Sequence, residues 1–344
     1  MSQMTRRTLI ATAAAAAAVA PTVAHAIAPA APAWTARAPT PWPVQEVYAA
    51  VWAGRIAVAG GLVGRTDAPL HIEDRLGLYD PSTDTWTQGP RLPQPRHHPM
   101  IVATGDTLFA VGGYGRGEGD WTNATEVWTL APGDAAWRPG PALPTPLAET
   151  VGLSHDGRIH LITGRSPLGQ ANAQWRDQGD VATHLALIDG RWETLSPCPM
   201  ARNSAAGAVL DGALWIAGGR TVSGGGTGRL DRYDPAGDRW DTLAPIPPSP
   251  SQGRQVGGGL AMAALDGKLV AFGGEWFGAG GGGGVFPETW IYDPAEDRWR
   301  EGPPMPTPRH GLAAAATGGA IHAIAGGEVV SGGRAGGVVE AFSL

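Results

Sequence analysis

The sequence predicts an all-β protein, a six-bladed β-propeller closed by its N-terminal strand. Three observations predict this fold. Short hydrophobic runs end in a glycine pair, or once in Thr-Gly, at intervals of 51 to 55 residues: Gly60-Gly61, Gly112-Gly113, Thr163-Gly164, Gly218-Gly219, Gly273-Gly274 and Gly326-Gly327. A tryptophan follows each of the first five pairs: Trp86, Trp137, Trp192, Trp240 and Trp299. Short Asp-Gly and Asp-Pro turns separate the runs, and this order is typical of four-stranded propeller blades.

The first blade shows how one repeat becomes a sheet. Residues 55–59 alternate in polarity and lead into the glycine pair, which predicts the second strand. Residues 76–79 and 84–88 predict the third and fourth strands, joined by the turn Asp80-Pro81-Ser82-Thr83-Asp84. Proline sets φ for such a turn, and its leading aspartate can accept hydrogen bonds from backbone amides.

The sixth blade lacks its own fourth strand. After Gly326-Gly327 the chain reaches a third strand at 339–342 and stops at Leu344. Trp34 precedes Trp86 by one repeat, so residues 29–36 are expected to pair beside the C-terminal strand and close the ring. An open ring, or one closed by dimerisation, is the alternative to the closed monomer that we expect.

The chain divides into residues 1–26, an export signal, and residues 27–344, the propeller. Arg6-Arg7 precedes Leu9-Ile10 and an alanine-rich run, which resembles a twin-arginine signal, and Ala24-His25-Ala26 offers a cleavage site. An ordinary secretory signal is the alternative. Both place the mature protein in the periplasm or outside the cell, and no membrane anchor is expected.

Composition excludes some classes of function. The formal net charge is −6, and it becomes more negative when the two signal arginines are removed, which argues against a nucleic-acid-binding protein. Cys198 is the only cysteine, so no disulfide can form within the chain and stability must come from burial.

The repeat resembles the kelch motif over essentially the whole of 27–344. The resemblance implies the propeller fold but not a reaction, since propellers carry unrelated functions. In the kelch proteins of ubiquitin-ligase adaptors, arginines at one repeat position grip acidic peptides, and Arg96, Arg202 and Arg309 occupy matching places here. These arginines could equally bond loop carbonyls and be structural.

One face of the ring is expected to hold the site. The turns between the first and second strands and between the third and fourth strands are short and repetitive. The loops on the other face are long and differ in every blade, and such loops usually carry binding. We therefore expect a site at the mouth of the central channel on that face.

Residues that enter each innermost strand, or follow each glycine pair, should point toward this mouth. They combine guanidinium groups with carboxylates, a set that suits an acidic or polyhydroxylated ligand. The predicted ligand-binding residues are Arg96, His97, Glu149, Arg165, Arg202, Asn203, Arg220, Glu275, Arg309 and His310. Catalysis, if present, would use Glu46 or Glu149 as a base and Arg202 or Arg309 to stabilise an oxyanion. No metal site and no cofactor are expected, because the adjacent His97 and His98 should point to opposite sides.

Three tryptophans lie in loops outside the repeat: Trp121, Trp175 and Trp276. Each could stack on a sugar ring or fold back as a loop anchor.

Three kinds of function are candidates for this predicted propeller. The first is binding of a small polar ligand, a sugar or sugar acid, with or without isomerase activity, because bacterial sialic-acid epimerases are also exported six-bladed kelch propellers. The second is a non-catalytic module that recognises a protein or peptide. The third, copper oxidation as in the kelch-containing galactose oxidase, is disfavoured because that enzyme has seven blades and a copper site of two tyrosines and two histidines, with a cysteine crosslinked to one tyrosine.

Overall fold

A computed structural model describes residues 31–64, 70–223, 225–278 and 282–344. The chain separates into two units, Met1–Ala31 and Pro32–Leu344, and all the strands of the described residues lie in the second unit. The predicted export signal at 1–26 lies outside the described residues. Within the described ranges, no helix has the length and apolar character needed to cross a membrane.

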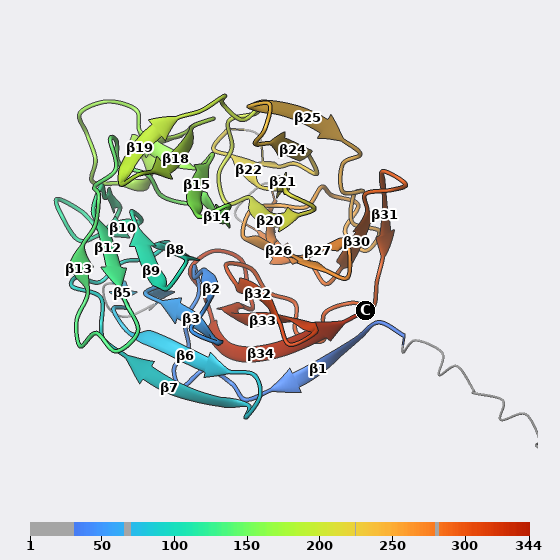
Figure 1. The fold of residues 1–344 in the computed structure, drawn as a ribbon. Helices are drawn as coiled ribbons and strands as arrows, with labels where there is room; N and C mark the ends of the chain where they lie inside the picture. Colours follow the sequence, from blue (N-terminus) through green and yellow to red (C-terminus); the bar gives the residue numbers. More distant parts are fainter. Residues whose placement is uncertain (1–30, 65–69, 224, 279–281) are drawn as a thin grey trace, which may run out of the picture. The chain divides into compact units, whose positions relative to one another are not determined.

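Six four-stranded antiparallel sheets surround a common axis and form the predicted propeller (Figure 1). We label the strands of each blade a to d, from the axis outward, and the a strands of neighbouring blades contact one another. The blades are β2 (Ala49–Trp52), β3 (Arg55–Ala59), β6 (Leu76–Asp80), β7 (Thr85–Gly89); β8 (Met100–Thr104), β9 (Thr107–Val111), β12 (Val127–Leu130), β13 (Arg138–Pro139); β14 (Val151–His155), β15 (Arg158–Ile162), β18 (His184–Ile188), β19 (Arg191–Thr194); β20 (Ala206–Leu210), β21 (Ala213–Ala217), β24 (Leu230–Asp234), β25 (Arg239–Leu243); β26 (Leu260–Leu265), β27 (Lys268–Gly273), β30 (Thr289–Asp293), β31 (Arg298–Glu301); and β32 (Ala313–Thr317), β33 (Ala320–Gly327), β34 (Ala335–Ser343), β1 (Ala33–Arg37).

The N-terminal strand closes the ring, as the sequence predicts. β1 pairs antiparallel with β34, with Trp34 opposite Phe342. The Trp34 ring packs on Phe272 of the fifth blade at 5.2 Å between ring centroids. The first and last strands of the propeller therefore share one sheet, which removes the open edge.

Each fourth-strand tryptophan ties its blade to the preceding one. Its indole N–H donates to a carbonyl just after strand d of that blade, at 2.8 to 3.1 Å. The pairs are Trp34–Pro303, Trp86–Ala38, Trp137–Pro90, Trp192–Pro141, Trp240–Ser196 and Trp299–Ala244. The repeat tryptophans thus have a structural role.

The Asp-Pro turns reinforce the same junctions. Asp84 Oδ1 accepts hydrogen bonds from the Tyr79 hydroxyl and from the Ala38 amide of the neighbouring blade. Asp238 and Asp297 do the same in their blades. The leading aspartate of each turn bonds a backbone amide inside the turn, as expected.

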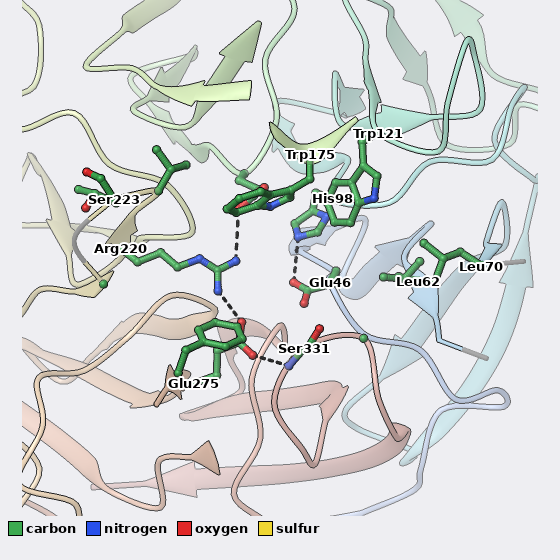
Figure 2. A pocket seen from close by; sticks show the side chains of 16 residues that line it. Glu46, Leu62, Leu70, His98, Trp121, Trp175, Arg220, Ser223, Glu275 and Ser331 are labelled. Atoms are coloured by element: carbon green, nitrogen blue, oxygen red, sulfur yellow. Dashed lines mark hydrogen bonds and ion pairs between the residues drawn. The ribbon is translucent and has the colours of Figure 1, made fainter. Parts of the chain in front are cut away.

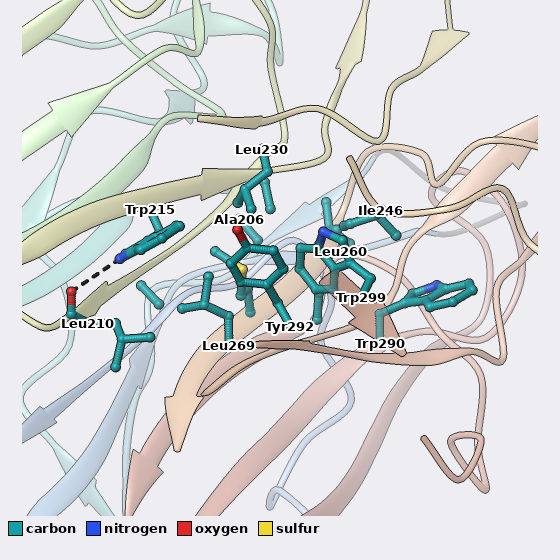
Figure 3. Close-up of a cluster of buried hydrophobic side chains, with 14 of the residues drawn as sticks. Ala206, Leu210, Trp215, Leu230, Ile246, Leu260, Leu269, Trp290, Tyr292 and Trp299 are labelled. Atoms are coloured by element: carbon teal, nitrogen blue, oxygen red, sulfur yellow. Dashed lines mark hydrogen bonds between the residues drawn. The ribbon is translucent and has the colours of Figure 1, made fainter. Parts of the chain in front are cut away.

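Apolar side chains fill the space between blades. In the cluster between the fourth and fifth blades, Trp215, Leu260 and Tyr292 pack together (Figure 3). Comparable buried clusters occur at other junctions around the ring. The core is therefore a set of inter-blade layers.

Two-stranded hairpins extend the b–c loops of the first five blades on one face. They are β4 (Leu62–Val63) with β5 (His71–Ile72), β10 (Tyr114–Gly115) with β11 (Thr122–Asn123), β16 (Arg165–Pro167) with β17 (Gln178–Asp180), β22 (Arg220–Thr221) with β23 (Gly225–Gly226), and β28 (Glu275–Phe277) with β29 (Gly283–Val285). In the sixth blade, β33 and β34 lengthen instead.

The sixth glycine pair lies one residue earlier than the sequence pattern suggests. The left-handed φ values that mark the pair in the other blades occur at Ala325 (58°) and Gly326 (106°), where the β33–β34 register shifts. Gly327, and not Glu328, therefore takes the position that follows the pair.

Two buried histidines lie between the third and fourth blades. His160 Nδ1 lies 3.0 Å from His184 Nε2, and His184 Nδ1 lies 3.2 Å from the Ser196 carbonyl. Because that carbonyl only accepts, His184 Nδ1 carries the proton, and His160 donates to His184 Nε2. Burial lowers the pKa of each histidine to about 4, and in His160 the neighbouring His184 adds to this effect.

This pair predicts acid sensitivity. In the unfolded chain these histidines bind protons with a pKa near 6.5, whereas in the folded chain they do so only at about pH 4. Between these pH values the unfolded state binds more protons than the folded state, so stability falls as the pH drops. The loss should reach up to about 3 kcal/mol per histidine. Urea unfolding from pH 4 to 7 measures it. His160→Asn should reduce the pH dependence of the unfolding free energy by up to one proton, and a pH dependence equal to that of the unchanged protein would contradict the assignment.

Candidate functional site

A cavity of about 640 Å³ opens at the mouth of the ring on the face of the b–c hairpins (Figure 2). Its floor comes from the segments that enter the a strands, and its walls come from the hairpins and from the β33–β34 loop. The lining residues are Glu46, Leu62, Leu70, His98, Trp121, Glu149, Trp175, Arg220, Thr221, Val222, Ser223, Gly225, Glu275, Phe277, Ser331 and Gly332. The cavity thus lies on the face where the sequence predicts a site.

A ring of left-handed residues builds the floor. The segment that enters each a strand contains one residue with φ between 50° and 72°, one to three residues before the strand begins. These residues are Glu46, His98, Glu149, Ser204, Gly259 and Gly311. Around most of the ring a backbone N–H donates to the carbonyl of the preceding blade, as from His98 to Glu46 at 3.1 Å and from Gly311 to Gly259 at 2.8 Å. The backbone repeats while the side chains differ, so each blade contributes different chemistry at the same radius.

Gly311 leaves room for a carboxylate. A Cβ at this position would lie 2.7 Å from the Glu46 carboxylate, closer than real Cβ contacts allow. The glycine in the sixth blade therefore makes the space that the acid of the first blade occupies.

Glu46 is the first member of a buried hydrogen-bonded chain. Its Oε2 lies 2.9 Å from His98 Nε2, and His98 Nδ1 lies 2.8 Å from His97 Nδ1. The expectation that the adjacent His97 and His98 point to opposite sides is therefore wrong, because His98 has a left-handed φ of 53° and does not continue an extended strand. His97 Nε2 donates to the Asp120 carbonyl at 3.0 Å, which leaves His97 Nδ1 as an acceptor. His98 must then donate from both nitrogens, so it is an imidazolium beside the Glu46 carboxylate.

The pKa values follow from this chain. Burial alone would raise the pKa of the Glu46 carboxyl, but the charges of His98, His310 and Arg220 outweigh it and hold that pKa well below its usual range. Burial lowers the pKa of His98, and the adjacent Glu46 more than reverses this, so that the pKa is raised. Burial and the charge of His98 lower the pKa of His97 to about 3. Glu46 is ionised, His98 is charged and His97 is neutral at pH 7.

Arg220 lies between two other carboxylates. Its Nη1 donates to Glu275 Oε1, and its Nη2 lies 3.7 Å from Glu149 Oε2 (Figure 2). Its Nε donates to Asn203 Oδ1 at 3.2 Å. Burial lowers the pKa of the guanidinium, but the negative charges of Glu149, Glu275 and Glu46 outweigh burial and raise this pKa overall. Arg220 is therefore a permanent cation.

Glu149 holds the third blade's loop in place. It accepts hydrogen bonds from the Tyr114 hydroxyl (3.0 Å), from Ser204 Oγ (2.7 Å) and from Arg165 (3.4 Å). Burial would raise its pKa, but the charges of His98, Arg220 and Arg165 lower it to about 2. Three protein donors and the Arg220 guanidinium at 3.7 Å thus surround this carboxylate.

Arg165 supports the Trp175 wall from below. Its Nη2 donates to the Trp175 carbonyl at 2.9 Å, and its Cζ lies 4.0 Å from the centroid of the indole. Trp175 begins the short 3-10 helix η1 (Trp175–Asp177), in which Asp177 caps the amide of Gln174. The indole is therefore held over a buried cation although it is 40% exposed.

Trp121 forms the adjacent wall, and the two indoles lie on the same side of the cavity (Figure 2). It packs edge-on against His97, with 4.7 Å between ring centroids. Trp276 does not line the cavity and instead stacks with Arg254, whose Cζ lies 4.4 Å from its ring. Two of the three loop tryptophans thus face the site.

His310 lies behind the floor. Its Nε2 donates to the carbonyls of Val329 and Ser331, both at 3.0 Å. Its Nδ1 lies 3.4 Å from Glu46 and 3.5 Å from Glu275 without forming a hydrogen bond. In the described ranges, no group of three or more His, Cys, Asp or Glu side chains has a geometry that could hold a metal ion.

Arg96, Arg202 and Arg309 do not reach the cavity. Each side chain turns back along its own blade. Arg202 is fully buried and donates to Asp231 at 2.8 Å and to the Ile216 carbonyl. Arg309 bonds Glu340 and the carbonyls of Ala323 and Ala325, and Arg96 pairs with Glu126. These arginines connect strands b and c to the entry of strand a, so the expectation that they point toward the channel mouth does not hold.

The remaining predicted residues divide between the lining and the layer beneath it. Glu46, Glu149, Arg220 and Glu275 line the cavity, while His97, Arg165, Asn203 and His310 lie under it. His98, Phe277 and Ser331 were not among the predicted binding residues. His98 shares the register of Glu46 and Glu149, fourteen residues before the glycine pair, and that register is the signal that would have found it.

The comparisons agree with this architecture. The family model described as Kelch motif matches residues 201–247 and 257–306. The chain thus carries kelch motifs in its fourth and fifth blades. It is 27% identical over 317 residues to the Kelch-like protein terF of Aspergillus terreus, covering 88% of this chain and 64% of the relative. It is 30% identical over 190 residues to human Kelch-like protein 34, covering 54% of this chain and 28% of the relative. The propeller chain thus spans less than two thirds of the length of these curated relatives.

A solved structure shares the fold. The chain in "Structure of YjhT" superposes with a TM-score of 0.69 at 16% identity, covering 88% of the propeller chain and 94% of the other. At this identity the likeness concerns the fold alone.

Gly311 offers a test of the floor. Gly311→Ala should destabilise the propeller and displace the Glu46 carboxylate, because the added Cβ meets it at 2.7 Å. Gly318→Ala is the matched control, since Gly318 also has a left-handed φ (61°) but nothing lies within 4 Å of its Cβ position. The control should lose about 1–2 kcal/mol, the cost of the left-handed alanine. Thermal unfolding compares the two, and equal losses would contradict the contact.

Proposed function

We propose that this propeller binds a neutral sugar in the channel-mouth cavity. One observation carries the proposal: two partly exposed charged groups of the floor, Glu46 and Arg220, lie beneath the walls formed by Trp121 and Trp175. Export, predicted from residues 1–26, would place this site outside the cytoplasm.

The floor can accept and donate hydrogen bonds. The side chains of Glu46 and Arg220 are 14% and 18% exposed, whereas those of Glu149 and Glu275 are 1% and 3% exposed. Among the described residues, Glu46 Oε1 has no hydrogen-bond partner, and its ion-pair partner His310 Nδ1 lies 3.4 Å away. Arg220 Nη2 makes only a 3.7 Å ion pair with Glu149. A sugar hydroxyl can donate to the first group and accept from the second.

The walls suit the rest of a sugar ring. The C–H face of a pyranose is apolar and can pack on an indole, which is a large and rigid apolar surface. Trp175 cannot turn away freely, because its carbonyl and its ring are both held by Arg165. Preorganisation of this kind lowers the entropic cost of binding.

The charge of the floor favours a neutral ligand over a sugar acid. Arg220 is the only guanidinium group of the described lining, and it already faces Glu149 and Glu275. An anionic ligand would also meet Glu46. Repulsion between the negative charge of such a ligand and the Glu46 carboxylate would oppose binding in a partly buried site.

The protonation states favour binding over turnover. A general base works best when its pKa lies near the operating pH, but Glu46 is held well below that range and Glu149 is at about 2. His98 is protonated and could serve as a general acid rather than a base, yet both of its nitrogens already donate hydrogen bonds within the protein. The resemblance to sialic-acid epimerases therefore supports a carbohydrate ligand in general, but neither the acidic sugar nor the reaction of those enzymes.

The first test is thermal unfolding of residues 27–344 with a panel of neutral sugars, sugar acids, acidic peptides and divalent metal ions. A neutral sugar at a hundred times its dissociation constant should stabilise the protein by about 2.7 kcal/mol. Glu46→Ala and Trp175→Ala should each abolish the shift, because they remove the acceptor and the wall.

Trp276→Ala is the matched control, since Trp276 lies in a neighbouring loop but outside the lining. It should keep the sugar-induced shift. A shift with acidic peptides alone would instead support the protein-interaction module, and a shift with sugar acids alone would contradict the charge argument.

A second measurement separates binding from catalysis. Exchange between the anomers of the bound sugar, followed by NMR magnetisation transfer, should match the rate in buffer, because the pKa values of the candidate bases Glu46 and Glu149 lie far below 7. An acceleration that disappears in Glu46→Gln would overturn this and establish isomerase activity.

A further inference from the structure

The upper walls of the cavity are apolar and exposed. Within the described ranges, the exposed large hydrophobic side chains are Val51, Leu168, Trp175, Val222 and Phe277. Trp175, Val222 and Phe277 line the cavity and come from the b–c hairpins of three successive blades. Apolar side chains that gather at one exposed place mark a binding surface more often than chance exposure does.

The structure holds the hairpin of the fourth blade in place. The Val222 amide donates to Asp180 Oδ2 at 2.8 Å, and Asp180 Oδ1 accepts from Asn203. This hairpin is thereby tied to β17 in the third blade. Val222 occupies the turn between β22 and β23, where a polar residue would serve the fold equally well.

Phe277 is the most exposed of the three, at 53%. Its ring lies 5.6 Å from the Arg220 Cζ, so it stands beside the outer edge of the charged floor. The same cavity therefore changes from ionised groups at the bottom to apolar groups at the rim. A monosaccharide on the floor would leave the rim uncovered.

We infer that the ligand is a glycoside whose sugar lies on the floor and whose apolar substituent, an aryl or alkyl group, packs on Phe277 and Val222. This inference rests on the proposed sugar site and specifies the class of ligand that the site binds. The free energy of covering the rim comes from burial of apolar surface, so it should appear with a negative heat-capacity change.

Calorimetric titration with methyl and phenyl glycosides of the same sugar tests the inference. The phenyl glycoside should bind at least about tenfold more tightly, which corresponds to about 1.4 kcal/mol. Phe277→Ser should reduce this ratio toward one. Leu168→Ser is the matched control, because Leu168 is more exposed than Phe277, at 76%, yet lies outside the lining, and it should leave the ratio unchanged.

The outcomes distinguish the two proposals. Equal affinity for methyl and phenyl glycosides, or a preference that survives Phe277→Ser, would overturn the inference while leaving the sugar site in place. A preference lost in Leu168→Ser as well would also overturn it, since the effect would not be local. Failure of every glycoside to bind would instead overturn the proposed function.

Discussion

Six indole N–H groups connect the blades into a ring, and the rest of the structure depends on this connection. Each one crosses a blade junction and donates to a carbonyl that follows strand d of the neighbouring blade. A blade alone has two apolar faces that it cannot bury, so its stability comes from contact with its neighbours. Trp34 and Trp86 make this contact across the two ends of the chain, which turns a row of sheets into a closed ring.

Closure determines where chemistry can occur. Once the outer strands are fixed, the entries to the inner strands converge on the axis, and their left-handed residues lie at one radius. The backbone hydrogen bonds around this ring do not depend on side chains, so the side chains are free to vary. In this chain the variation gives Glu46, His98, Glu149 and Ser204 on one side and two glycines on the other. The asymmetry creates a cavity with a charged floor from a nearly symmetric fold.

Repetition made the fold predictable, and the same repetition limited the prediction of the site. Glycine pairs, tryptophans and turns recur with a constant spacing, so six blades and closure by Trp34 follow from the sequence. The site required the direction of each side chain. Arg202 and Arg309 lie two residues before the left-handed position and turn back into their own blades, where they bond Asp231 and Glu340. The register that contains Glu46 and Glu149 also contains His98, but the bulge at Ala325 shifts the sixth blade by one residue and obscures the alignment.

The buried charges of the floor are the strongest sign that the cavity has a function. Glu149 and Arg165 are fully buried, and burying ionised groups costs free energy that their attraction repays only when the geometry is good. Apolar residues fill the equivalent space at the blade junctions, and the indole bonds already hold the ring together. Stability alone would therefore favour an apolar floor. The chain instead keeps Glu46 ionised by placing His98 beside it, keeps His98 charged by making His97 an acceptor, and leaves Glu46 Oε1 facing the cavity. Each of these steps makes sense if a hydroxyl group of a ligand completes the arrangement.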